Sequence, residues 1–125
     1  MATLSLVGVV CGYVINIVHN KDIFVRKQEC AKYLEQGKEY ASSGDQSHYF
    51  LEELFIFYSP VRNTCVLAFT NNNLQSLHDR SYTLKDMLTG NPIFSDFSSL
   101  DSTGKTTAGE KYEAQLKELG YIRPN

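Results

Sequence analysis

An uncharged, largely apolar stretch opens the chain. Residues 2–18 contain no Lys, Arg, Asp or Glu, although Thr3, Ser5 and Asn16 dilute them. A membrane-spanning helix needs about 20 predominantly apolar residues, so this stretch lies at the short end of the usable range. The absence of charge is easier to explain in lipid than at the edge of a sheet. We therefore expect residues 1–20 to form a single-pass transmembrane anchor that contacts the membrane through residues 2–18.

The type of anchor and an alternative to it follow from the same residues. A removed signal peptide would need a basic leader and a small-x-small cleavage site, and this stretch has neither, so an uncleaved signal anchor fits better. Within an anchor, Gly8 and Gly12 have the G-x-x-x-G spacing that lets two helices associate closely. Alternatively, LSLVGVV and YVINIV are two buried strands that turn at Cys11 and Gly12, because Val and Ile favour strands.

Residues 21–41 have the period of an amphipathic helix. Apolar or small side chains recur at near-helical spacing, at Ile23, Cys30, Leu34 and Ala41. We expect this helix to continue from the anchor, with Gly37 weakening its last turns by about 1 kcal/mol relative to alanine. The turn-forming sequence SSGD at residues 42–45 should then end it.

The centre of the chain changes to the period of strands. Two apolar runs, residues 51–58 and 64–70, are separated by a short loop with Pro60 and Asn63, which is typical of a β-hairpin. In the second run both alternating faces are apolar, as in a central strand that is covered on both sides. This hairpin is therefore the predicted centre of the core.

Two further strands are predicted after the hairpin. The Asn triplet at residues 71–73 indicates a loop, and residues 82–88 predict a third strand. Its inward face would carry Tyr82, Leu84 and Leu88. After the turn signal TGNP, residues 93–97 predict a short fourth strand. Three or four such strands in sequence predict an antiparallel meander.

The clearest helical pattern is at residues 107–119. Thr107 and Glu110 fit a capping box, and Gly120 supplies a C-terminal stop. The buried face is predicted at Ala108, Tyr112, Leu116 and Leu119. The predicted fold class is α+β: a hydrophobic N-terminal helix running into an amphipathic one, then the meander with the C-terminal helix packed on it. By length, residues 21–125 make one small domain.

The three cysteines bear on the cellular compartment. Cys11 lies in the apolar stretch, which leaves Cys30 and Cys65 as the two thiols of the charged part. An even pair in a small domain is typical of an oxidising compartment, so we predict a disulfide between them. The alternative is two reduced cysteines that act as small buried hydrophobes.

Charge gives the opposite indication about orientation. Lys21, Arg26 and Lys27 follow the apolar stretch, and nothing basic precedes it. Taken literally, the positive-inside rule places the domain in the cytoplasm. Because the cysteine pair points the other way, we expect an extracytoplasmic domain.

Candidate chemistry is sparse. The formal net charge is -2 with both signs interspersed, which gives no basic face for nucleic acid. His19, His48 and His78 have no metal-ligand spacing. Glu52 and Glu53 would face opposite sides of a strand. A nucleophilic thiol needs a positioned base, and none is demonstrably near Cys65. The sequence therefore predicts no catalytic, cofactor-binding or metal-ligating residue.

The layout of the chain resembles that of pilins and pseudopilins. These have a hydrophobic N-terminal helix that continues into an amphipathic helix and then an antiparallel sheet. The Phe-Thr-Leu-x-Glu signature and the basic leader of that family are missing here. The order of ECAKYLEQ, FYSPVRNTCVLAFT, LTG and IFSDF is also similar to that of small membrane-anchored bacterial proteins of unassigned function. Neither resemblance implies an activity.

These observations lead to an expected function and two alternatives. We expect a membrane-anchored, exported domain that serves interaction or assembly with a second copy or another protein. The first alternative is a pilin-like assembly subunit. The second is a soluble small enzyme or ligand-binding domain in which residues 1–18 are core strands.

Overall fold

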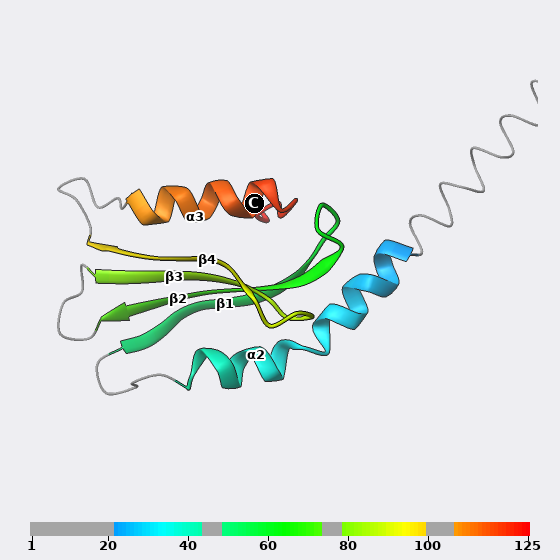
Figure 1. Cartoon of the computed structure of the whole chain (residues 1–125), viewed down its shortest axis with the longest axis horizontal. Coiled ribbons are helices and arrows are strands. Elements are labelled where there is room, and N and C mark those ends of the chain that lie inside the picture. The colour runs from blue at the N-terminus through cyan, green and yellow to red at the C-terminus, as the bar shows by residue number, and fades with distance from the viewer. Residues whose placement is uncertain (1–21, 44–48, 74–78, 100–106) are drawn as a thin grey trace, which may run out of the picture.

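The computed structural model describes residues 22–43, 49–73, 79–99 and 107–125 (Figure 1). Their elements in chain order are a helix at residues 22–31, α2 (Leu34–Ala41), β1 (Tyr49–Ser59), β2 (Thr64–Asn73), β3 (Asp79–Asp86), β4 (Pro92–Ser99) and α3 (Thr107–Glu118). The fold is α+β, as the sequence predicts. The predicted anchor, with Gly8 and Gly12, lies outside the described residues. Within the described ranges, no helix is long and apolar enough to cross a membrane.

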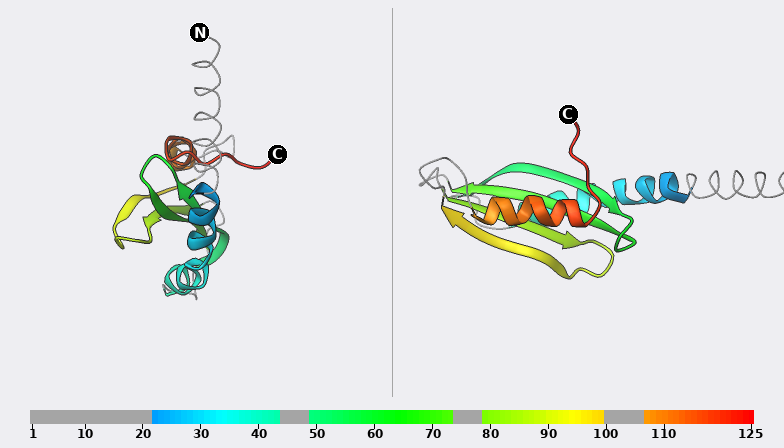
Figure 2. Two further views of the ribbon diagram at one scale, coloured as in Figure 1. Left: turned by 90° about the vertical axis from the view of Figure 1, so that its right-hand side faces the viewer. Right: turned by 90° about the horizontal axis from the view of Figure 1, so that it is seen from above.

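The four strands form one antiparallel meander in the order β1-β2-β3-β4. Helices cover both faces of this sheet: α3 lies on one face and α2 on the other (Figures 1 and 2). The 22–31 helix precedes α2 and extends past the end of the sheet. The predicted meander and the packing of the C-terminal helix on it are therefore correct. The second helical layer makes the domain a three-layer structure.

Two apolar clusters, one on each face of the sheet, form the core. The cluster under α3 consists of Val66, Ala68, Tyr82, Leu84, Ala108, Tyr112, Leu116 and Leu119. The cluster on the α2 side consists of Cys30, Ala41, Cys65, Leu67, Phe69 and Met87. Strand β2 contributes alternate residues to both clusters, and its first seven residues are all buried. This is the doubly covered central strand that its sequence predicts.

The single helix predicted for residues 21–41 is wrong, because the helix breaks after residue 31. The backbone N–H groups of Lys32 and Tyr33 donate to the carbonyls three residues earlier, at Glu29 and Cys30. Such bonds make a tighter turn than the α-helix. The break redirects the chain, so that Cys30 faces β2 at one end while α2 lies along the sheet.

Three predicted strand boundaries also need correction. The Asn triplet at 71–73 belongs to β2, where all three residues pair with β1 and the first two also pair with β3. Strand β3 begins at Asp79 and ends at Asp86, so Leu88 lies in the following turn and is 53% exposed. Strand β4 extends the predicted range 93–97 by residues at both ends. In β2 and β4 pairing with a neighbouring strand outweighs local turn propensity, whereas the turn after Asp86 ends β3 early.

The C-terminal helix agrees closely with its sequence pattern. Its predicted inward face is buried. At its end, the N–H of Gly120 donates to the carbonyl of Lys117 and the N–H of Tyr121 donates to that of Leu116. Gly120 has a φ of 86°, the left-handed conformation that such a helix stop requires. The residue that would cap the start of α3 lies outside the described residues.

Gly37 allows α2 to approach the sheet closely. A Cβ atom at this position would lie 2.6 Å from Cδ1 of Leu67, whose side chain is fully buried in β2. Gly37 itself is buried. A residue that appears from sequence only to weaken a helix therefore sets the distance between α2 and β2.

We expect the substitution Gly37→Ala to destabilise the protein. In an exposed helix this change stabilises by about 1 kcal/mol, whereas overpacking against a buried side chain costs about 1 to 3 kcal/mol. Denaturant unfolding should therefore show a lower free energy of unfolding. The control is the same change in a Leu67→Ala background, where the space is open and the helical preference should reappear. Stabilisation in both backgrounds would contradict the close approach.

Candidate functional site

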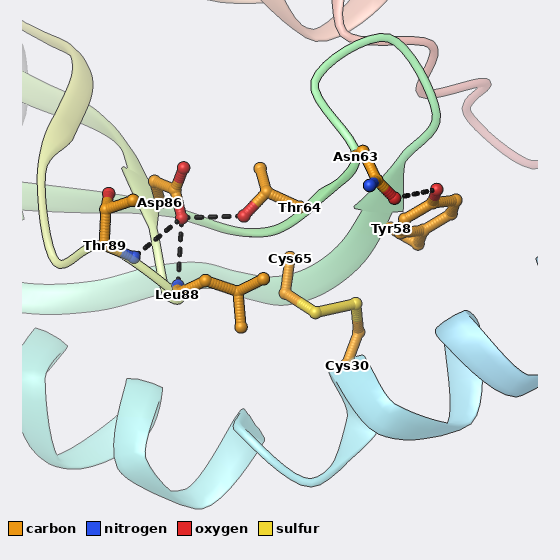
Figure 3. Close-up of a disulfide and its surroundings, with 8 residues drawn as sticks. All are labelled: Cys30, Tyr58, Asn63, Thr64, Cys65, Asp86, Leu88 and Thr89. Carbon is orange, nitrogen blue, oxygen red and sulfur yellow. Dashed lines mark hydrogen bonds between the residues drawn. A yellow bond between two sulfur atoms is a disulfide. The ribbon is translucent and has the colours of Figure 1, made fainter.

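The Cys30–Cys65 pair joins the first helix to the central strand. The two sulfur atoms are 2.00 Å apart and the Cα atoms 5.2 Å apart, so the structure brings the predicted cysteines to disulfide distance (Figure 3). Cys30 ends the 22–31 helix before its break, and Cys65 is the second residue of β2. Both are almost fully buried, at 2% and 4% exposure. Solvent therefore has little access to the sulfur atoms.

The β1–β2 turn positions Cys65 at the start of its strand. Asn63 adopts a φ of 51° in this turn, and its Oδ1 accepts a hydrogen bond of 2.7 Å from the Tyr58 hydroxyl (Figure 3). The buried hydroxyl of Ser59 donates a 2.7 Å hydrogen bond to the carbonyl of Leu119. The turn is thus attached to the end of α3 as well as to its own strands.

Asp86 organises the neighbouring β3–β4 turn. Its Oδ1 accepts hydrogen bonds from the Thr64 hydroxyl at 2.7 Å and from the N–H groups of Leu88 and Thr89 at 2.9 and 3.1 Å (Figure 3). Burial alone would raise the pKa of this carboxyl, but these hydrogen bonds together lower it below its ordinary value. Because Thr64 precedes Cys65, the carboxylate fixes the turn beside the disulfide.

A groove of about 350 Å³ lies beside the disulfide. It is lined by side chains from the 22–31 helix, α2, the β1–β2 turn and the β3–β4 turn. Its charged groups are Arg26, Glu29 and Lys32, and Tyr58 and Leu88 supply apolar surface. Such a groove can accept a side chain or a short segment that carries charge of either sign. The described part of the chain holds no cluster of three or more His, Cys, Asp or Glu residues that could bind a metal ion.

Glu52 and Glu53 are not placed as the sequence predicts. A register irregularity between Leu51 and Glu53 interrupts β1. Glu52 pairs with Arg80 at 3.1 Å, and Glu53 pairs with Arg123 at 3.1 Å. Strand alternation puts Arg80 on the α3 side of β3. Arg123 also binds Glu113 of α3. The carboxylates of Glu52 and Glu53 therefore both form ion pairs on the α3 side of the sheet. The prediction of opposite faces fails because a bulge adds a residue to the strand.

The structure also shows polar groups that the sequence did not single out. Arg123 donates from Nε and Nη2 to the carboxylate of Glu113, at 2.6 to 3.0 Å, and from Nη2 to Glu53. Tyr121 stacks on Phe55 with ring centroids 4.7 Å apart. These contacts fasten the C-terminal segment to β1, and only the folded chain brings them together. His19, His48 and His78 lie outside the described residues.

We expect removal of the disulfide to lower stability substantially. Cys30 and Cys65 are separated by 35 residues, and closing a loop of this length stabilises by about 3 to 4 kcal/mol in the chain-entropy model. The double variant Cys30→Ser/Cys65→Ser should lose about that much free energy of unfolding. Both proteins are best compared in a Cys11→Ser background, which prevents thiol exchange. Equal stabilities would show that the bridge does not form.

We expect the variant Asp86→Asn to lose about 1 to 3 kcal/mol of stability at neutral pH, since it replaces a charged acceptor of three hydrogen bonds. Because folding lowers the pKa of Asp86, its contribution is complete above the unfolded-state pKa of about 4 and is lost as the pH falls through the folded value. Urea titrations from pH 7 downward should therefore converge for the two proteins. The exposed Glu39→Gln change is the control and should have little effect at neutral pH.

Comparison with known proteins gives no family assignment: no protein-family model, no curated protein and no solved structure matches this chain. The function proposed below therefore rests on the residues of the chain itself.

Proposed function

We propose that this protein is a membrane-anchored domain held in an oxidising compartment, where it serves interaction or assembly. The observation that carries the proposal is the Cys30–Cys65 pair at disulfide distance. Disulfides persist outside the reducing cytosol, where small domains use them to supplement a modest core. The uncharged residues 2–18, which come shortly before the described helix, supply the anchor.

The position of the cysteine pair supports this compartment further. Cys30 lies on the last turn of a helix whose outer positions are exposed, and Cys65 is the second residue of the most deeply buried strand. A bridge between these two elements holds the anchor-proximal helix against the sheet. This arrangement suits a domain whose attachment to a membrane has to be rigid.

The groove beside the disulfide supports an interaction role. It combines cations, a carboxylate and aromatic surface over four segments of the chain, a mixture that suits recognition of another polypeptide. The groove walls are fixed by the disulfide, by Asp86 and by the Tyr58–Asn63 hydrogen bond. A preformed site of this kind loses less entropy on binding.

The two alternatives make different demands on the chain. A pilin-like subunit predicts one long N-terminal helix, whereas the described helices are interrupted at Lys32 and Tyr33. A soluble enzyme or ligand-binding domain needs residues 1–18 as core strands, and these residues lie outside the described ranges. Solubility without detergent would favour the second alternative.

The experiment that tests the proposal combines membrane fractionation with thiol labelling of the full chain after denaturation. We expect the protein in the membrane fraction, released only by detergent, with one thiol labelled without reductant and all three labelled with it. A protease added outside intact cells, on the non-cytoplasmic side of the membrane, should then cleave the domain. A protein that is soluble without detergent and has three free thiols would refute both the anchor and the compartment.

A further inference from the structure

Exposed apolar side chains gather at the end of the domain where the described chain begins. Among the described residues, the three most exposed large hydrophobic side chains are Ile122 at 87%, Val61 at 68% and Phe24 at 61%. Leu88 and Val25 are also about half exposed. We call these five residues the entry patch. Large apolar side chains that protrude singly are common on protein surfaces, whereas several gathered at one end of a domain are not.

The segments that carry the entry patch meet at that end. Ile122 and Lys27 line one groove, of about 380 Å³, and Leu88 and Arg26 line the groove beside the disulfide. A Cβ atom on Gly120 would lie 3.8 Å from Cγ2 of Val61. Both Figure 1 and the right-hand view of Figure 2 show the β1–β2 turn, the β3–β4 turn and the 22–31 helix at the same end of the sheet. The segments that carry the entry patch therefore lie at one end of the sheet.

Chain length ties this surface to the membrane, given the anchor proposed above. Only residues 19–21 separate Val18, the last residue of the uncharged stretch, from Asp22. A fully extended chain spans at most about 3.6 Å per residue, so Asp22 lies within about 14 Å of Val18. The polar layer on each side of a bilayer is about 5 to 8 Å thick. An anchored chain thus has the start of the 22–31 helix, which carries Phe24 and Val25, close to the lipid headgroups.

The charges around the entry patch suit an anionic lipid surface. Lys27 and Arg62 are exposed on the same segments, and Lys32 is exposed just after the 22–31 helix, where Glu29 is an exposed carboxylate. Arg26 is half-buried and has a carboxylate partner in Asp22 at 3.6 Å. A basic side chain near the surface of an anionic membrane contributes about 1 kcal/mol, and protruding apolar side chains add their own burial in the interface.

We propose that the entry patch is a membrane-contact surface that inserts its apolar side chains into the headgroup region of the bilayer that holds the anchor. The partner is a lipid surface containing anionic headgroups. One end of the sheet then contacts the membrane. The opposite end, which includes the last residues of β4, points away from the membrane (Figure 1).

Single tryptophans test this proposal, because the chain contains no Trp. Val61→Trp, Ile122→Trp and the control Phe97→Trp are each made in the full chain. Phe97 is 52% exposed and lies toward the far end of β4. The proteins are reconstituted into phosphatidylcholine and phosphatidylglycerol vesicles with or without brominated acyl chains. We expect bromine to remove about half of the emission of the first two variants and little of the control.

The outcomes separate this inference from the proposed anchor. If the chain enters the vesicles but Val61→Trp and Ile122→Trp are quenched no more than Phe97→Trp, the membrane contact is refuted and the anchor stands. If the chain does not enter vesicles at all, the anchor fails and the contact fails with it. Protection of the two tryptophans from acrylamide without quenching by bromine would indicate a contact with a second copy of the chain, and would also overturn the lipid assignment.

Discussion

The burial of β2 on both faces is the constraint on which the rest of the structure depends. Its side chains alternate between two apolar clusters, and neither face has a polar row that could meet water. A strand of this kind is stable only when both faces of the sheet are covered. Helix α3 covers one face with a regular amphipathic stripe. The other face is covered by a shorter helix that needs Gly37 to come close and a disulfide beside it.

The parts of the fold that follow from local pattern were predictable. The hairpin of β1 and β2, the buried face of α3 and its stop at Gly120 all appear in the sequence as alternation, helical period or turn chemistry. The parts that depend on partners were not. Asn71 to Asn73 extend β2 because they pair with β1, and Asn71 and Asn72 also with β3, although the triplet alone favours a loop.

The candidate site shows the same division. The pairing of Cys30 with Cys65 could be proposed by counting cysteines, whereas the groove beside it depends on a helix break that no periodicity indicates. The role of Asp86 was also hidden, since its hydrogen-bond donors come from Thr64, 22 positions earlier, and from the turn that follows it. The predicted inward position of Leu88 failed for this reason, because the Asp86 turn ends the strand two residues before it.

The disulfide also determines the path by which a mechanical force on the chain passes through the domain. A pull on the chain from the side of residue 22 passes along the first helix to Cys30, crosses the sulfur atoms, and enters the sheet at Cys65. The 35-residue loop that the bridge closes, which contains α2 and β1, lies outside this path. Tension between the first helix and the body of the domain would therefore act on the central strand, and α2 could detach without the domain lengthening.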